Sequence, residues 1–482
     1  MASITSLGIG SGLDINSIVT QLVALEREPL KQMQTDASTL QTKVSSYGKI
    51  QSLFSAVQDA SNKLSGSALW TQVSAKSADT TAMAVTATGA AATGSYAVSV
   101  QALATSQSVV SGARFANTTD LVGSGTLNVE LGAWDTGRTA FTAKAGATPL
   151  AITVTATDTL GTLRDKINAA GAGVSASIVT DASGSRLAIR SSDTGLENGF
   201  RITAADDDGG NTDAAGLSRF AYDPTTGAAQ MLHSQAGANA LATINGIEVT
   251  SATNVLSGAV DGLTIQLGKV TTGPVDVSVS SDTDAINKAI TDFAKAYSDL
   301  STYLGDQTKY DAASKTGGPL QGDSTATGLQ GRLRSVLNSP SGASASFPRL
   351  SDLGLELQRN GTLQVNQTKV TAALSNLKET KKAFSNYDTL DATNNGFAKR
   401  YALLATSILG ADGAITTRTE GLRKQITNNT ENQARLNDRV DLYQQRLVQQ
   451  YSAMDANMSK LNALSSYVTQ QLAGLTSSSS SK

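Results

Sequence analysis

The stretch LVQQYSAMDANMSKLNALSSYVTQQLAGL, residues 447–475, carries the clearest structural signal of the 482-residue chain. Its apolar positions recur alternately four and three residues apart: Leu447, Tyr451, Met454, Met458, Leu461, Val468, Leu472 and Leu475, with Ser465 in the same register. A period of about 3.5 residues places them along one narrow stripe of a helix, as in a coiled coil. Leu436, Val440 and Tyr443 extend the stripe backwards. The spacing therefore predicts one long helix over about 417–475.

The beginning of the chain has a similar helical pattern. Ser11 and Asp14 match the S-x-x-D capping pattern, in which the Ser11 hydroxyl accepts a hydrogen bond from a free amide of the first turn. The apolar residues that follow are three and four positions apart: Ile15, Ile18, Leu22 and Leu25. Pro29 has no amide hydrogen to donate into a preceding turn, so it predicts either the start of a second helix or a kink in the first. The apolar stripe of that helix runs from Leu30 to Leu64.

Between about residues 70 and 281 the chain changes to short alternating runs of Thr, Val, Ser and Ala, which predict strands. The clearest runs are 96–100, 174–180, 186–190 and 275–279. Asp181–Gly184 and Asn245-Gly246 predict hairpin turns, and one short helix is expected over 160–170. Helical spacing returns after Asp282, with a small hairpin around Asn360-Gly361.

These patterns predict a multidomain α plus β fold. The early helices have no helical neighbour close in sequence, so their natural partners are the late helices. The two ends of the chain are expected to form a coiled-coil-like stalk, and the β-rich middle is expected to be an inserted head. Because isolated short helices are marginal in water, we expect the segments before about Leu30 and after about Leu461 to be mobile in the free protein and to order in an assembly.

Composition argues against several classes of function. The 38 basic and 40 acidic residues are mixed and give a net charge of −2, so neither nucleic acid nor a membrane surface is an expected partner. The chain has no cysteine, which excludes disulfides and thiolate chemistry. No segment approaches the roughly 18 apolar residues of a membrane span. The first basic residue is Arg27, so we expect no cleaved secretory signal.

Three motifs resemble sites for phosphate binding, catalysis or calcium binding, and none has the residues that such a site requires. Gly8, Gly10 and Gly12 lack the G-x-G-x-x-G spacing and the preceding strand of a phosphate-binding loop, so a flexible hinge is the favoured interpretation. His233 is the single histidine and is interpreted as a surface or loop residue. Residues 206–211, DDDGGN, resemble a calcium loop but lack the closing glutamate, which favours a solvated acidic turn. We predict no enzyme activity, cofactor or metal.

Four stretches resemble one family, the bacterial flagellar filament cap proteins, also called hook-associated protein 2. SLGIGSGLDINSIVTQLVALEREPL at 6–30 resembles the family's N-terminus. LGTLRDKINAAGAGVSASIVTDASGSRLAIRSSDTG at 160–195 is similar to a motif shared by flagellin and hook-associated proteins. GPLQGDSTATGLQGRLRSVL at 318–337 and LGLELQRNGTLQVN at 353–366 resemble the family's C-terminal region.

The resemblance implies a non-enzymatic protein at the distal end of the flagellum, secreted through the flagellar type III export apparatus with an export chaperone. There a ring of several copies would retain exported flagellin and promote its folding and insertion into the growing filament. The hook–filament junction proteins would be further partners. The chain ends would be leg segments that enter the filament. The residues that would form the assembly surface of the leg helices are Leu13, Ile15, Ile18, Leu22, Leu461, Val468, Leu472 and Leu475.

The resemblance also implies a domain division. We expect an N-terminal leg segment at 1–45, a helical stalk domain at 46–75 and 283–430, and a C-terminal leg segment at 431–482. The head would consist of one β-rich domain at 76–115 and 236–282 and an outer β-rich domain at 116–235.

Two alternatives remain open at this point. A hook–filament junction protein or a flagellin would share the helical ends, but the SGLDINSIV start and the GPLQGDST and LQRNGTLQV stretches favour the cap. A tip adhesin that binds host surface glycans would use the β-rich head. The apolar stripes of the helices do not determine the number of subunits in a ring.

Overall fold

The computed structural model describes residues 14–313 and 315–479. These residues form two compact units. The helical unit comprises the two ends of the chain, up to Leu69 and from Thr283 onward, and the β-rich unit comprises Trp70–Asp282. The predicted α plus β fold is therefore confirmed, with the β-rich residues inserted in sequence between the two helical ends.

The helices follow the predicted spans closely. They are α1 (Ile15–Glu26), α2 (Glu28–Ser65), α3 (Ser67–Trp70), α4 (Leu160–Ala170), α5 (Thr283–Thr308), α6 (Ser324–Asn338), α7 (Gln367–Leu374), α8 (Leu377–Ser385), α9 (Phe397–Leu409) and α10 (Ala414–Ser479). Pro29 lies in the first turn of α2, where its missing amide hydrogen costs nothing. The N-cap of α1 is Asp14, whose carboxylate accepts a hydrogen bond from the Ser17 amide at 3.0 Å. The expectation of a Ser11 cap was therefore wrong about the capping residue, and Ser11 lies outside the described residues.

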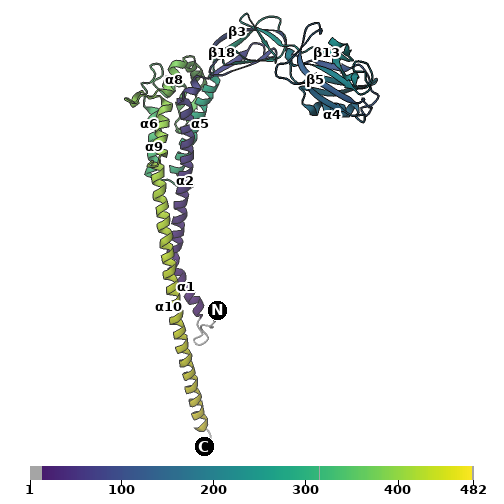
Figure 1. Cartoon of the computed structure of the whole chain (residues 1–482). Helices are drawn as coiled ribbons and strands as arrows, with labels where there is room; N and C mark the ends of the chain where they lie inside the picture. The colour runs from purple at the N-terminus through teal and green to yellow at the C-terminus, as the bar shows by residue number, and fades with distance from the viewer. Residues whose placement is uncertain (1–13, 314, 480–482) are drawn as a thin grey trace. The chain divides into compact units, whose positions relative to one another are not determined.

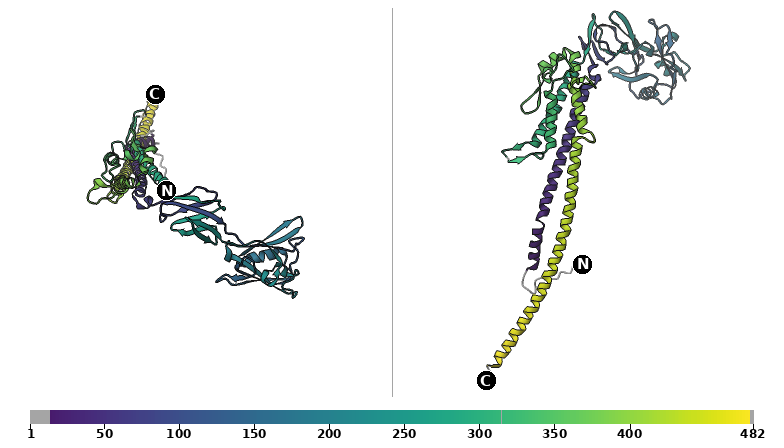
Figure 2. Two further views of the ribbon diagram at one scale, coloured as in Figure 1. Left: turned by 90° about the horizontal axis from the view of Figure 1, so that it is seen from above. Right: turned by 90° about the vertical axis from the view of Figure 1, so that its left-hand side faces the viewer.

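Helix α2 is the centre of the helical unit and packs against α5, α9 and α10. Figures 1 and 2 show α2 and α10 running side by side. The predicted apolar stripe of α2 is fully buried in its second half, at Tyr47, Ile50, Phe54, Val57 and Leu64. The predicted stripe of α5 is buried along its whole length, at Ile286, Ile290, Phe293, Tyr297, Leu300 and Leu304. Early and late helices thus share one core, as the sequence pattern predicted.

A buried polar network joins three of these helices. Asp323 precedes α6, where its Oδ1 atom accepts hydrogen bonds from the amides of Thr325 and Ala326 at 3.0 and 3.2 Å. The same oxygen accepts the Tyr47 hydroxyl of α2 at 2.7 Å. Its Oδ2 atom accepts two bonds from the Arg418 guanidinium of α10, at 3.0 and 2.7 Å. The Asp323 side chain is 2% exposed, so this carboxylate ties α2, α6 and α10 together in the interior.

The β-rich unit is built from short antiparallel strands. They are β1 (Val73–Ser77), β2 (Met83–Ala87), β3 (Gly94–Ala102), β4 (Ser108–Ser111), β5 (Gly125–Trp134), β6 (Phe141–Ala143), β7 (Leu150–Val154), β8 (Val174–Asp181), β9 (Gly184–Ser191), β10 (Gly199–Asp206), β11 (Tyr222–Asp223), β12 (Ala228–Ala229), β13 (Met231–Gln235), β14 (Ala240–Ile244), β15 (Ile247–Ser251), β16 (Val255–Val260), β17 (Leu263–Leu267) and β18 (Val275–Ser281). Two small hairpins belong to the helical unit: β19 (Tyr310–Asp311) with β20 (Thr316–Gly317), and β21 (Leu355–Leu357) with β22 (Leu363–Val365).

The strands of the β-rich unit enclose two separate cores. One core lies between a five-stranded sheet of order β1-β18-β3-β14-β15 and a three-stranded sheet of order β16-β17-β2, and its residues come from 82–104 and 240–279. The other includes residues of the β12-β11-β10-β5-β6 sheet, of the β13-β4-β9-β8 sheet and of α4, all within 109–231. Val109 and Phe115 pack in the second core. The structure therefore places the change of core before Val109, earlier in the chain than the expected boundary at 116.

The hairpin turns show how local sequence sets register. Asn245 and Gly246 have φ angles of +50° and +82°, the left-handed conformation that a type I′ turn requires at both positions. Asp181 pairs directly with Gly184, as predicted for the β8–β9 hairpin. The turn at Asn360-Gly361 is longer than two residues, because the ladder closes at Leu357 opposite Leu363.

Candidate assembly site

Helix α1 packs against the middle of α10. Its buried residues are Ile15, Val19 and Val23, which form a small apolar cluster with Leu436, Val440 and Leu447 of α10. Leu22 and Tyr443 are partly buried at the edge of the same cluster. Residues from the first and last tenths of the chain thus share one interface, as Figure 1 shows for α1 and α10.

The buried face of α1 differs from the predicted one. The sequence pattern pointed to Ile15, Ile18, Leu22 and Leu25, whereas the buried positions are four residues apart and Leu25 is 69% exposed. Ile18 is partly buried, beside the contact rather than within it. A row of residues spaced four apart runs at an angle to the helix axis. By the end of α1 this buried row has moved away from the predicted stripe, which includes Leu25. Packing against α10 therefore determines which apolar row of α1 is buried.

Two ion pairs border this cluster. Arg27 lies 3.6 Å from Asp441, and Glu26 lies 4.0 Å from Arg439. All four side chains are about half exposed or more, so these pairs contribute little to stability. The α1–α10 contact therefore depends on its small apolar cluster.

Beyond α1 the apolar stripe of α10 continues and its large side chains are exposed. Figures 1 and 2 show the C-terminal part of α10 extending past α1. Leu461, Val468 and Leu472 are 58%, 48% and 57% exposed. The same segment exposes further large apolar side chains, namely Met454, Met458, Leu464 and Tyr467. Of the predicted leg residues, Leu13 and the side chain of Leu475 lie outside the described part of the structure.

The motifs considered for chemistry in the sequence, His233 and the acidic turn at 206–211, make structural contacts. His233 lies in strand β13 rather than in a loop, and its ring stacks on Tyr222 with centroids 6.3 Å apart. In the acidic turn, Asp206 is buried and accepts a hydrogen bond from the Ser218 amide at 2.7 Å. Over residues 14–313 and 315–479, no three His, Asp or Glu side chains are arranged to hold a metal ion. Gly8, Gly10 and Gly12 lie outside the described residues.

Comparison with known proteins decides the family. The profile for the flagellar hook-associated protein 2 N-terminus matches residues 11–107, and that for its C-terminus matches residues 237–463. The chain is 32% identical to flagellar hook-associated protein 2 of Escherichia coli K12 over 98% of both chains. The chain belongs to the flagellar hook-associated protein 2 family. The resemblance seen in the sequence is confirmed.

Other matches agree with membership of the hook-associated protein 2 family. B-type flagellar hook-associated protein 2 of Pseudomonas aeruginosa is 31% identical over 98% of both chains. The crystal structure of the D1-D2-D3 domains of the flagellar cap protein FliD from E. coli superposes with a TM-score of 0.56, at 29% identity over 78% of this chain and 99% of that one. The flagellin hook IN motif matches residues 140–193. These matches favour a flagellar cap protein, located at the filament tip outside the cell, over a junction protein or an adhesin.

The α1–α10 contact can be tested with two small changes. Val19→Ala is expected to weaken the docking of α1 by about 1–2 kcal/mol, because it removes two methyl groups from a side chain that is 5% exposed. Leu25→Ala is the matched control and is expected to change the docking by less than about 0.5 kcal/mol, since Leu25 is largely exposed. Amide hydrogen exchange of α1 in the dilute full-length chain gives the measurement. Equal exchange rates in the two variants would contradict this packing.

Proposed function

We propose that this flagellar cap protein retains exported flagellin at the distal end of the filament and promotes its folding and insertion. The observation that carries the proposal is the exposed apolar stripe of α10 from Met454 to Leu472, in a helix whose preceding part is buried against α1. A soluble helix with such a stripe is stabilised by burying it against another surface. The distal end of a filament supplies such surfaces in each neighbouring subunit.

The leg residues have a common role in this proposal. Ile15, Ile18 and Leu22 hold α1 on or beside α10, while Leu461, Val468 and Leu472 face the neighbouring subunits of the assembly. Leu13 and Leu475, the other two predicted leg residues, belong to the same proposal. The expected mobility before Leu30 does not agree with the packing of α1 against α10 in the single chain, where α1 is expected to be ordered. Ordering of the chain after Leu461 on assembly stays a prediction. Strong amide protection at Leu472 in a dilute monomer would contradict it.

The expected domain division belongs to the same proposal. Leg segments at 1–45 and 431–482 enter the filament, and the helical domain at 46–75 and 283–430 supports them. The two β-rich domains, with the first boundary moved from 116 to before Val109 and the second kept near 235, form the plate of a ring made of several copies. The two separate cores of the β-rich unit support two head domains.

The proposal includes four kinds of partner: other copies of the chain, flagellin, the hook–filament junction proteins, and the type III export apparatus with its chaperone. It includes no catalytic activity, cofactor or nucleic acid. In the described part of the chain, no helix is both long and apolar enough to cross a membrane.

Deletion of the gene tests the proposal. In the deletion strain we expect most exported flagellin to appear as monomer in the medium and filaments to be short or absent, because nothing retains subunits at the tip. The measurement is the ratio of monomeric to filamentous flagellin, with and without the intact gene restored. Filaments of normal length in the deletion strain would rule out the cap role for this chain.

A further inference from the structure

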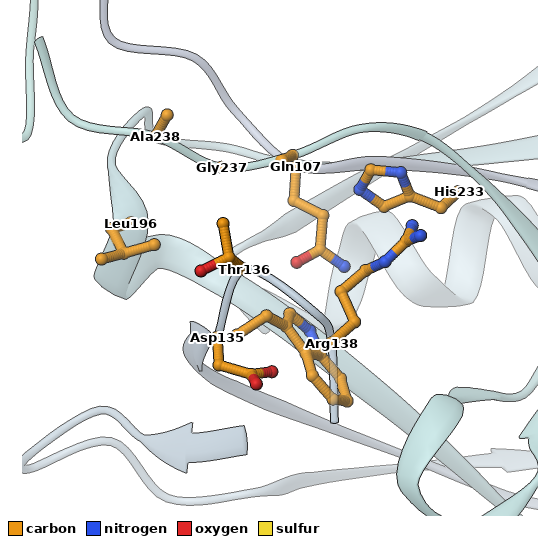
Figure 3. Close-up of a pocket in the computed structure, with 11 residues that line it drawn as sticks. Gln107, Asp135, Thr136, Arg138, Leu196, His233, Gly237 and Ala238 are labelled. Carbon is orange, nitrogen blue, oxygen red and sulfur yellow. The ribbon is translucent and has the colours of Figure 1, made fainter. Parts of the chain in front are cut away.

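Side-chain amides complete the backbone hydrogen bonding at several places in the β-rich unit. Gln107, which Figure 3 shows beside a cavity of about 660 Å³, accepts a hydrogen bond from the Phe200 amide at 3.0 Å and donates one to the Phe200 carbonyl at 2.8 Å. Asn168 of α4 has the same relation to Ala176 of β8, at 2.7 and 2.9 Å. Each side chain therefore bonds to the backbone of its residue as a neighbouring strand would.

Strand β8 lies at one edge of the β13-β4-β9-β8 sheet and pairs with β9 along all of its residues, without a bulge. In an antiparallel pair, alternate residues direct both backbone groups to the partner strand, and the residues between them direct theirs outward. Since Ala176 faces outward to Asn168, Ile178 and Thr180 also face outward. Over residues 14–313 and 315–479, no group bonds to the outward amide or carbonyl of Ile178 or Thr180. Beyond Ala176 the edge of β8 is therefore unpaired, and residues 177–181 are called the open edge.

The open edge lacks the features that usually prevent strands from pairing. Its sequence, SIVTD, contains no lysine or proline, and its register with β9 is regular. Val179 is 57% exposed, whereas Ile178 packs partly against the core formed by residues 109–231. Asp181 is the one charged residue of the open edge, and it lies 3.2 Å from Arg114, which offsets its charge. An unprotected edge of this kind is a template for another strand.

We propose that the open edge pairs with the same edge of a second copy of the chain, antiparallel and centred on Val179. In this register Ile178 lies opposite Thr180 of the second copy, and the two residues exchange both of their outward hydrogen bonds. Val179 lies opposite Val179 of the second copy, and the two form an apolar pair on the exposed face. Ser177 lies opposite Asp181 of the second copy, so a hydroxyl meets a carboxylate and no like charges face each other.

A second copy fits this edge better than an unrelated strand does. Val179 is the middle residue of the open edge, so two copies leave no residue of it unpaired and bring each Asp181 opposite a serine. Such a contact uses the same surface of both chains and therefore joins them in pairs. It is small, so we expect the association to be transient. The pairing involves the β-rich unit alone and does not rest on the capping function.

Single-cysteine crosslinking tests the pairing, because the chain contains no cysteine of its own. In the full-length Val179→Cys variant the two thiols would be adjacent, since opposite residues of this kind have Cα atoms about 4.5 Å apart and a disulfide spans about 4.4–6.8 Å. Ser177→Cys is the matched control on the same strand and face, and Ser177 is also exposed. Its two cysteines would lie about 13 Å apart along the strands. With diamide as the oxidant, we expect Val179→Cys to form a disulfide-linked dimer on non-reducing gels at least about tenfold faster than Ser177→Cys.

A proline tests the role of the outward backbone groups. Added to Val179→Cys, Thr180→Pro removes one outward amide hydrogen and no bond to β9, so we expect dimer formation to slow about tenfold or more. Thr180→Ala is its control, because both changes lose the 2.8 Å contact between the Thr180 and Ser185 hydroxyls and alanine keeps the amide hydrogen. Far-ultraviolet circular dichroism should be the same in all variants. Equal rates for Val179→Cys and Ser177→Cys, or for the proline and alanine variants, would overturn the proposal and leave a strand of another protein as the occupant.

Discussion

Replacement of Asp323 by alanine is expected to lower the free energy of unfolding of the helical unit by about 3–5 kcal/mol, because it leaves a cation without its buried partner. The Arg418 guanidinium loses both of its bonds to Asp323, and the Tyr47 hydroxyl loses its acceptor. The first turn of α6 also loses its capping carboxylate. Denaturant unfolding followed by circular dichroism at 222 nm measures the change.

The control for Asp323→Ala is Asp299→Ala. Asp299 pairs with Lys295 one turn earlier on the surface of α5, at 2.6 Å, and both side chains are about half exposed or more. Its replacement is expected to change the free energy of unfolding by less than about 0.5 kcal/mol. Similar losses in the two variants would show that the buried network contributes no more than an exposed ion pair.

The pH dependence of unfolding gives an independent check on Asp323. Its hydrogen bonds from Tyr47 and Arg418 hold the pKa of the folded carboxyl below its ordinary value despite burial. Its stabilisation is therefore complete above the unfolded-state pKa of about 3.9 and is lost as the pH falls through the lower folded-state pKa. Between about pH 5 and pH 2, the wild-type chain should lose more stability than Asp323→Ala loses.

Much of the fold follows from local sequence. The helix predicted over 160–170 is α4, because Thr159 and Thr162 form a reciprocal capping box and Gly171 adopts the left-handed conformation at its end. The Asn245-Gly246 hairpin has the predicted register for a similar reason, since few residues tolerate positive φ at both turn positions. Helix caps and turn residues of this kind lie within a few residues of the helix end or turn that they determine.

The features that sequence reasoning missed depend on distant partners. Both Leu22 and Val23 are apolar, and only the position of α10 decides that Val23 is buried and Leu25 exposed. Tyr47, Asp323 and Arg418 lie far apart in the chain, so no spacing connects them. Arg138, between β5 and β6, has a φ of +60°, which the sequence did not signal because arginine has no preference for positive φ. Leu461 and Leu472 are different, since their heptad spacing alone placed them on an apolar stripe of the helix, and both are exposed in the structure.

The double change Leu461→Asp and Leu472→Asp is expected to abolish capping without destabilising the monomer. Both side chains are more than half exposed in the single chain, so the melting temperature should shift by less than about 2 °C. Two carboxylates in an apolar subunit contact would each cost several kcal/mol. Cells that express this variant should therefore release flagellin monomer about as strongly as the deletion strain.

The matched control moves the same charges to the opposite face of the helix. Ser459→Asp and Gln470→Asp each lie two residues before a leg position, about 200° around α10, and both side chains are exposed. Their introduction adds the same net charge to the same segment, so it controls for export and solubility. We expect this variant to restore filaments in the deletion strain. If the two variants behaved alike, the charge of the segment rather than its apolar stripe would explain the phenotype, and the assembly surface assigned to Leu461 and Leu472 would be wrong.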